Sequence, residues 1–136
     1  MDIRMILKST DSSAFYRNNK PYDFHVHLPR PLTLNGQWSV SLLETCLPSS
    51  ESETDVYIFS NLCEDTIVGD KELPLLRRVY LKKSSENQIF KYPYEVSTRL
   101  GQVHDVHIYI KDTDGQEASF LQKDTSVTLL LKWKSL

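Results

Sequence analysis

Alternation of apolar and polar residues with a period of two constrains the fold of this chain more than any other feature. In residues 22–28, apolar side chains stand at every second position, namely Tyr22, Phe24, Val26 and Leu28. Successive side chains of a β-strand point to opposite faces, so this stretch predicts a strand with one buried and one exposed face. Residues 3–8 repeat the pattern.

Further stretches predict strands because they are rich in β-branched, aromatic and leucine residues. They are residues 38–47, 56–62, 75–81, 89–94, 103–110 and 127–133, with short extended pieces near 66–68 and 119–122. Turn-forming pairs separate many of these stretches, for example Asn35-Gly36 and Asp114-Gly115. About eight or nine strands at short spacing, without helical periodicity, predict an all-β sandwich or barrel.

Two strands carry more specific expectations. In residues 38–47, Trp38, Val40 and Leu42 are expected to share one face, which Cys46 would extend, with Leu43 and Leu47 on the opposite face. After residues 22–28, Pro29 and Pro31 predict an extended connector, because proline cannot donate to a strand ladder.

The chain is expected to be a single domain over residues 1–136, since this length buries enough surface for one core. We find no internal repeat, linker or low-complexity segment. The polar residues 49–55 are expected to form an exposed loop.

The charge balance argues against a protein that wraps nucleic acid. Sixteen basic and eighteen acidic residues give a formal charge of −2, whereas nucleic-acid-binding domains usually carry a strong basic excess. No run of about 18 apolar residues predicts a membrane span. Residues 1–8 are too short and too charged for the apolar region of a signal peptide, so synthesis and maturation in the cytosol or nucleus are expected.

The two cysteines, Cys46 and Cys63, each lie in an apolar stretch. A reduced thiol in such surroundings behaves as a small hydrophobic group. Two packed free thiols are therefore the favoured interpretation, with a single disulfide as the alternative.

Histidines offer the strongest candidate for chemistry, since the common phosphate-binding, zinc-protease and nucleophile-elbow motifs are all missing from the sequence. His25 and His27 lie two apart, so their rings share one face, and His104 and His107 could join them from another strand. Those two, three residues apart, would however face opposite sides of their strand. Metal-binding cupins use an H-x-H pair as metal ligands, together with a carboxylate a few residues later. Here the next acidic residue is Glu44. We therefore interpret His25 and His27 as the polar face of a strand and predict no metal, cofactor or catalytic residue.

The remaining charged candidates also favour structural roles. Acidic residues in the turns are expected to cap backbone amides or face water, and they are Glu64, Asp65, Asp70, Asp112 and Asp114. Arg77 and Arg78 are neighbours on a strand, so one is expected to point into a packed surface and to need a carboxylate partner. That partner can belong to the same subunit or to an interface.

Residues 28–44 read L-P-R-P-L-T-L-N-G-Q-W-S-V-S-L-L-E. They match every fixed position of the L-P-x-P-x-x-L-x-G-x-W-x-V-x-L-x-E pattern of one family. The chain thereby resembles the penton-type minor capsid protein of Polinton (Maverick) elements and adintovirus-like viruses. Further stretches resemble that family in the same order, at residues 11–19, 56–64, 67–70, 74–79, 106–115 and 127–132.

The resemblance implies a single jelly-roll sandwich of two four-stranded antiparallel sheets. It further implies a structural role in the virion capsid without enzymatic activity, as homopentamers at icosahedral five-fold vertices that contact the major capsid protein. Synthesis in the host cytoplasm is implied, with assembly in the host cell, the nucleus included. The motif positions implied to serve structure or interfaces are Leu28, Pro29, Gly36, Trp38, Gly69, Asp70, Leu76 and Arg77.

The chain also departs from the family pattern. Pro48 stands without the family's following His and Trp, and only residues 49–55 replace a long insertion. The chain thus resembles a trimmed family member, with a minor or cementing subunit as an alternative. A jelly-roll module that binds a receptor or glycan is the second hypothesis, and a cupin-like metalloenzyme is the third.

Overall fold

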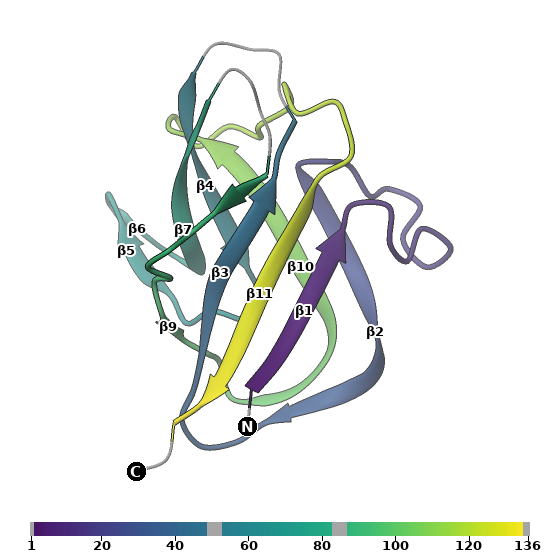
Figure 1. Cartoon of the computed structure of the whole chain (residues 1–136), viewed down its shortest axis with the longest axis vertical. Helices are drawn as coiled ribbons and strands as arrows, with labels where there is room; N and C mark the ends of the chain where they lie inside the picture. Colours follow the sequence, from purple (N-terminus) through teal and green to yellow (C-terminus); the bar gives the residue numbers. More distant parts are fainter. Residues whose placement is uncertain (1, 49–52, 83–86, 135–136) are drawn as a thin grey trace.

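The computed structural model describes residues 2–48, 53–82 and 87–134, and strands make up its regular structure (Figure 1). The strands are β1 (Asp2–Lys8), β2 (Asp23–Leu34), β3 (Trp38–Cys46), β4 (Thr54–Ser60), β5 (Thr66–Val68), β6 (Lys71–Leu73), β7 (Leu75–Leu81), β8 (Gln88–Ile89), β9 (Val96–Ser97), β10 (Gly101–Asp112) and β11 (Ser126–Trp133). The described residues contain no helix, and hence none with the length and apolarity that a membrane crossing requires. The all-β prediction is confirmed.

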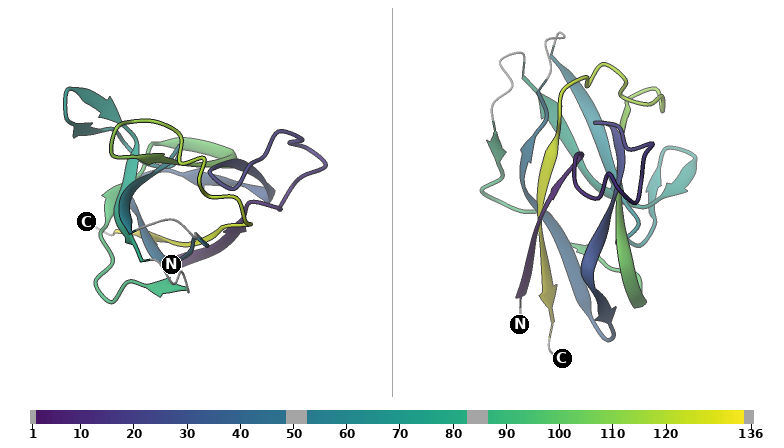
Figure 2. Two further views of the ribbon diagram at one scale, coloured as in Figure 1. Left: turned by 90° about the horizontal axis from the view of Figure 1, so that it is seen from above. Right: turned by 90° about the vertical axis from the view of Figure 1, so that its right-hand side faces the viewer.

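Two antiparallel sheets face each other. The first has the order β1-β11-β3-β8, with β9 also paired to β3, and the second has the order β2-β10-β4-β7. Figures 1 and 2 show the first sheet as one layer and the second as the layer behind it. A separate hairpin joins β5 and β6. The second sheet has the four strands that were expected. In the first sheet, two short strands, β8 and β9, share one edge, so five strands pair there.

The core lies between the two sheets and is supplied by alternating residues. Phe24 of β2, Ile58 of β4, Ile108 of β10 and Leu129 of β11 are each completely buried. Burial of one such side chain contributes roughly 1.5–3 kcal/mol relative to exposure. The alternation read from residues 22–28 therefore assigns Phe24 to the correct face.

A β-bulge in β3 overturns the expected faces of two residues. The register with β11 shifts between Thr128 and Leu129, so β3 uses one extra residue there. Beyond the shift, Thr45 is buried and Cys46 pairs with Ser126 on the outward face. Leu47 joins the core instead of the opposite face. Val40 and Leu42 are buried as expected, and Trp38 packs against the core.

The predicted connector at Pro29 and Pro31 is part of β2. This strand runs on to Leu34 and pairs again with the start of β10, after a register shift between Val103 and Asp105. Both prolines are tolerated because β2 is an edge strand, where a missing amide donor costs no ladder bond. The extended piece ends only at the turn before β3.

Other expected strands are shorter than predicted or absent. Residues 89–94 contribute only Ile89 to a strand, because the chain leaves β3 before Pro93 and returns at β9. Residues 119–122 form a turn in which the Leu121 amide donates to the Ala118 carbonyl at 3.0 Å. Sequence reasoning missed β6, which the Gly69-Asp70 turn folds back onto β5. The predicted loop at residues 49–55 lies partly outside the described residues.

Candidate functional site

The outward face of the second sheet carries a row of aromatic and imidazole rings. Its members are Tyr16, His25, His107, Tyr109, Phe59 and Tyr57, and we call them the ring band. Strand register creates the row, since His107 of β10 lies directly opposite His25 of β2, and Tyr109 lies opposite Phe59 of β4. Directly opposed side chains on one sheet face contact each other. The His25 and His107 rings stack with centroids 4.0 Å apart and planes 8° apart.

The β4 end of the ring band is tightly packed. Phe59 lies outside the core between the sheets, yet only 2% of its surface is exposed. Its ring stacks on Tyr109 at 5.0 Å. Burial raises the pKa of the Tyr109 hydroxyl, and the nearby carboxylate of Asp65 adds to the effect. This outward face therefore includes a small second core.

The segment between β1 and β2 covers the histidine end of the ring band. Tyr16 stacks on His25 with ring centroids 5.0 Å apart, and Phe15 stacks on His27 at 4.5 Å. The Asn19 side chain accepts a hydrogen bond from the His25 amide at 2.9 Å and donates to the His25 carbonyl at 2.8 Å. These bonds satisfy backbone groups on the free edge of β2, which would otherwise invite pairing with another chain.

Two carboxylates hold the histidines. Asp105 accepts hydrogen bonds from the Tyr16 hydroxyl and from Nδ1 of His27, the latter at 2.9 Å. These bonds, that of Tyr16 foremost, lower the pKa of Asp105, and the same contact raises the pKa of Tyr16. Asp23 lies 2.6 Å from Nε2 of His107.

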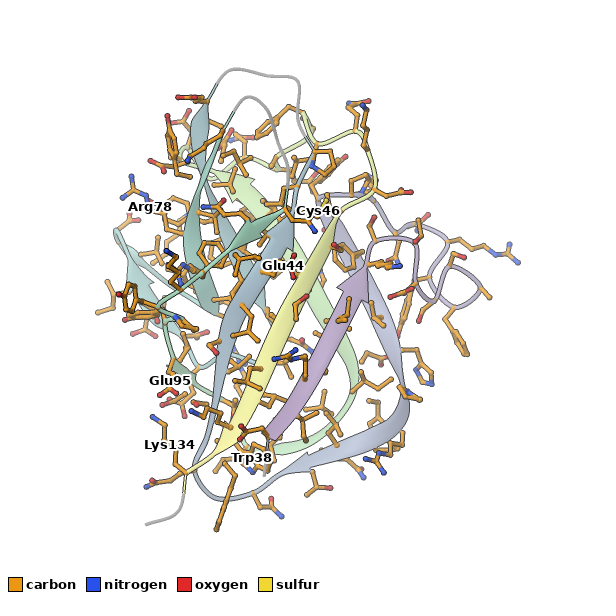
Figure 3. All side chains as sticks on the ribbon, in the orientation of Figure 1. Trp38, Glu44, Cys46, Arg78, Glu95 and Lys134 are labelled. Atoms are coloured by element: carbon orange, nitrogen blue, oxygen red, sulfur yellow. The ribbon has the colours of Figure 1, made fainter. Side chains whose placement is uncertain are left out.

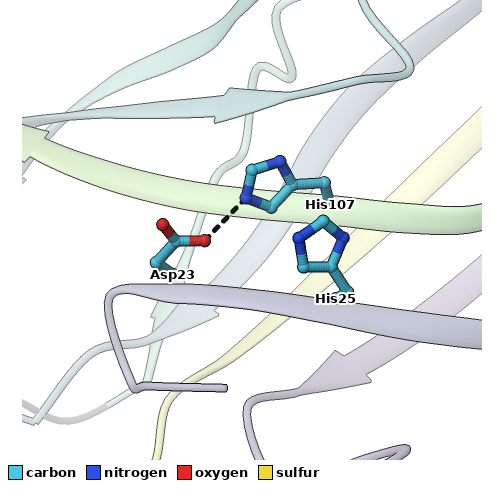
Figure 4. A group of neighbouring side chains, drawn as sticks. All are labelled: Asp23, His25 and His107. Atoms are coloured by element: carbon cyan, nitrogen blue, oxygen red, sulfur yellow. Dashed lines mark hydrogen bonds and ion pairs between the residues drawn. The ribbon is translucent and has the colours of Figure 1, made fainter. Parts of the chain in front are cut away.

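Asp23, His25 and His107 form a compact triad (Figure 4). Each offers one ligand atom, these atoms lie within 4.8 Å of one another, and each residue is half-buried. Burial, followed by the neighbouring His107, lowers the pKa of His25 and favours its neutral form. Two neutral imidazoles and a carboxylate are a ligand set that divalent transition metals accept.

The structure brings His107 beside His25 and leaves the other two histidines outside this pair. His25 and His27 share the outward face of β2 as predicted, since Phe24, Val26 and Leu28 between and beside them are buried. His107 joins His25, whereas His27 pairs with Asp105 and His104 belongs to neither pair. The carboxylate sought after the H-x-H pair precedes it, at Asp23. An Asp-x-His spacing on a strand could have revealed it, because residues two apart share a face.

Two hollows flank this site. One of about 550 Å³ is lined by residues 15–20 together with Asp23 and His25. The other, of about 500 Å³, includes Asn61, Arg99 and His107 in its lining. Solvent and small solutes therefore reach the triad from both sides.

Residues of the 28–44 motif form the connection between the two sheets. Leu28 is buried in the core, and Pro29 is exposed on the β2 edge. Gly36 has a φ of +83°, and a Cβ there would lie 3.3 Å from the indole nitrogen of Trp133. Nε1 of Trp38 donates to the Asn35 carbonyl at 3.0 Å. These residues shape the turn between β2 and β3.

The other motif residues lie around β5, β6 and β7. Leu76 is buried in the core, while Gly69, with a φ of +66°, and Asp70 form the exposed tip of the β5–β6 hairpin. The guanidinium of Arg77 lies 4.0 Å from the ring centroid of Phe90.

Within the described residues no carboxylate pairs with Arg77, and a carboxylate from another subunit stays a prediction. Arg77 donates instead to the Tyr92 carbonyl at 3.3 Å and stacks on Phe90, so a ring and a carbonyl take the carboxylate's place. Arg78 is exposed and forms the ion pair, with Asp55 at 2.5 Å. Figure 3 shows Arg78 at the margin of the molecule.

The turn acids and cysteines have structural surroundings. Asp112 accepts hydrogen bonds from the amides of Asp114 and Gln116, each at 2.9 Å, as expected of a turn acid. Both cysteines are free thiols, which confirms the favoured interpretation. Burial raises the pKa of Cys63 to about 12, whereas Cys46 is half-buried.

Comparison with known proteins yields no matching family model and no matching curated protein.

Proposed function

We propose that this chain is a penton-type, single jelly-roll capsid subunit that forms pentamers at icosahedral five-fold vertices and contacts a major capsid protein. The observation that carries the proposal is the match of residues 28–44 to the family pattern, together with the order of the other matching stretches. The fold, the position of the motif and one surface support it.

The pairing of strands supports a jelly roll. In chain order the strands pair from the outside inwards, β1 with β11, β2 with β10, β3 with β8 and β9, and β4 with β7. Successive pairs alternate between the two sheets. An eight-stranded antiparallel ribbon wrapped in this manner is a jelly roll, the sandwich that many viral shells use.

The position of the motif fits a role in the scaffold. Residues 28–44 contain the end of β2, the turn at Gly36 and most of β3, so they carry the chain from one sheet to the other. A glycine with positive φ packed against Trp133 explains the spacing of the pattern without any ligand. A shell subunit requires this type of rigid framework more than it requires a reactive site.

Exposed apolar side chains are available for contacts between subunits. Five large apolar residues, each at least 66% exposed, lie in or beside β5, β8 and β9, and they are Ile67, Ile89, Tyr92, Tyr94 and Leu100. Strands β5 and β9 are at the left of Figure 1. Large exposed apolar side chains are candidates for protein–protein contacts, and tyrosine is enriched in interfaces. A five-fold ring buries two different faces of each copy.

Co-assembly tests the proposal. The full chain is expressed with the major capsid protein of the same genome, and the particles are imaged by electron cryomicroscopy. We expect closed shells with five copies of the chain at each vertex. The double variant Tyr92→Asp, Tyr94→Asp should lose incorporation, whereas Ile6→Asp, on an exposed residue of β1, should retain it. Shells whose vertices exclude the chain would contradict the proposal.

A receptor- or glycan-binding module is the second candidate. The hollow lined by Phe15, Tyr16 and Asp23 favours it, because ligand sites are concave and combine apolar walls with a few polar groups. Phe15 is 67% exposed there. A glycan array probed with the labelled chain separates the two functions: selective binding by a monomer or trimer supports the module, and a pentamer without binding supports the capsid subunit.

A further inference from the structure

We propose that Asp23, His25 and His107 bind a divalent transition-metal ion, for which Zn²⁺ is the probe, and that the ion ties edge strand β2 to central strand β10. The proposal does not depend on the capsid function, because it rests only on the chemistry of these three side chains and on their positions.

Backbone pairing brings the three groups together. Asp23 and His25 are two residues apart on β2, so both side chains leave the same face of the sheet. His107 is the direct partner of His25 across the β2–β10 ladder, and Tyr109 is the partner of Asp23. The triad is therefore set by strand register and does not require a loop to fold over it. Sites built on strands hold their ligands more precisely than sites on loops.

The ligand atoms lie close to the distances that a small ion requires, and the stacked imidazole rings have to turn so that their nitrogens converge on it. Zinc bonds to nitrogen and oxygen are about 2.0–2.1 Å long, so tetrahedral ligand atoms lie roughly 3.3 Å apart. The Asp23–His107 contact, at 2.6 Å, is shorter than this, and the widest separation in the triad is at most 4.8 Å. Figure 4 shows the three side chains gathered on one side of the two strands. The ion would take the place of the present contact between Asp23 and His107.

Neighbouring groups hold the backbone of the two histidines in place. The His25 ring lies between the rings of Tyr16 and His107, and the Asn19 side chain binds both backbone groups of His25. On the other strand, the His107 amide donates to Oδ1 of Asn61 at 2.9 Å. Such supporting contacts raise metal affinity by reducing the freedom that ligands lose on binding.

The charges also favour a cation. Two imidazoles stacked 4.0 Å apart offer two nitrogen ligands side by side. Asp23 supplies one negative charge. Imidazole nitrogens prefer zinc, copper, nickel or iron, whereas calcium and magnesium prefer sites made wholly of oxygen ligands. Water can complete the coordination shell because each of the three residues is half-buried.

Calorimetric titration of the full, tag-free chain with zinc chloride tests the proposal. We expect one ion bound per chain at neutral pH, and no comparable binding of calcium or magnesium. Asp23→Asn, His25→Gln and His107→Gln should each weaken zinc binding by at least about tenfold, the scale of losses known for altered metal sites. His104→Gln is the matched control, since His104 lies on β10 outside the triad, and it should bind as the unaltered chain does.

Nuclear magnetic resonance of the unaltered chain provides a test that needs no variant. Zinc should shift the ring nitrogen signals of His25 and His107 and leave those of His27 and His104 in place. The proposal is overturned if zinc does not bind, if the shifts occur only at His27 or His104, or if binding survives unchanged in both His25→Gln and His107→Gln.

Discussion

The outward faces of the two sheets follow the same sequence pattern and have different structures. On the first sheet, outward residues of β1 such as Arg4 and Ile6 are exposed, and Ile6 keeps 62% of its surface in solvent. On the second sheet, the outward residues of β2, β10 and β4 form the ring band, where Phe59 keeps 2%. Alternation with a period of two assigns a residue to a face, but register and a covering segment decide what it contacts there.

The largest expected effect concerns burial on these two faces. Phe59→Ala should lower the free energy of unfolding by about 3–5 kcal/mol, as for a core phenylalanine, because it leaves a cavity beside Tyr109. Ile6→Ala should change it by no more than about 0.5 kcal/mol. Urea denaturation measures both. Equal, small losses of unfolding free energy in the two variants would contradict the difference in burial between the two faces.

The next largest effect concerns the segment between β1 and β2 that covers the histidine end of the ring band. Asn19→Ala should cost about 1–3 kcal/mol, because it removes hydrogen bonds to both backbone groups of His25 and leaves them without their partner. Asn18→Ala changes the exposed neighbouring side chain and should lie within about 0.5 kcal/mol of the unaltered protein. The same urea series provides the comparison, and similar costs for both variants would mean that the segment does not protect the β2 edge.

Acid should destabilise the ring band through His25. Its pKa is lowered from 6.5 in the folded chain by burial first and then by His107, against the opposing charges of Asp23 and Asp105. The unfolded chain therefore takes up the proton at higher pH, so this contribution to stability is complete above pH 6.5 and declines as the pH falls through the folded pKa.

In metal-free buffer, His25→Gln should consequently lose less stability than the unaltered chain between pH 7.5 and pH 5. Asp105 does not interfere in this window, because its lowered pKa lies below 3.8. Chemical denaturation across the pH series gives the slopes, and parallel slopes for the two proteins would exclude His25 as the source.

The smallest effect concerns the two thiols, one in the core and one on the outward face of the first sheet. Cys63 is completely buried with a pKa of about 12, so iodoacetamide should modify it in the native protein only after the chain opens. Cys46 pairs with Ser126 on the outward face of the first sheet and is half-buried, so it should react faster. Mass spectrometry of timed samples gives both rates, and faster modification of Cys63 would contradict its burial.

The sequence predicted the elements whose alternation is long and regular. Strands β1, β7, β10 and β11 lie close to the expected positions, and the outward position of His25 follows from its buried neighbours. A long periodic pattern constrains a strand strongly because any slip would turn its apolar side chains into water.

The sequence could not predict features that depend on pairing between distant strands. The bulge opposite Leu129 reversed the face of Cys46, and no local pattern in β3 signals it. The triad depends on the register that places His107 opposite His25, residues more than 80 positions apart from each other in the chain. The sequence offered His104 and His107 as candidates from a second strand, and it contains the Asp-x-His spacing, but it does not show which histidine lies opposite His25.

Native mass spectrometry of the purified chain tests the central claim of a ring-forming capsid subunit most directly. The account predicts a pentamer of the 15.8 kDa chain, formed at the expense of the monomer as concentration rises. A chain that remains a monomer, or that stops at a trimer, over the whole concentration series would contradict it.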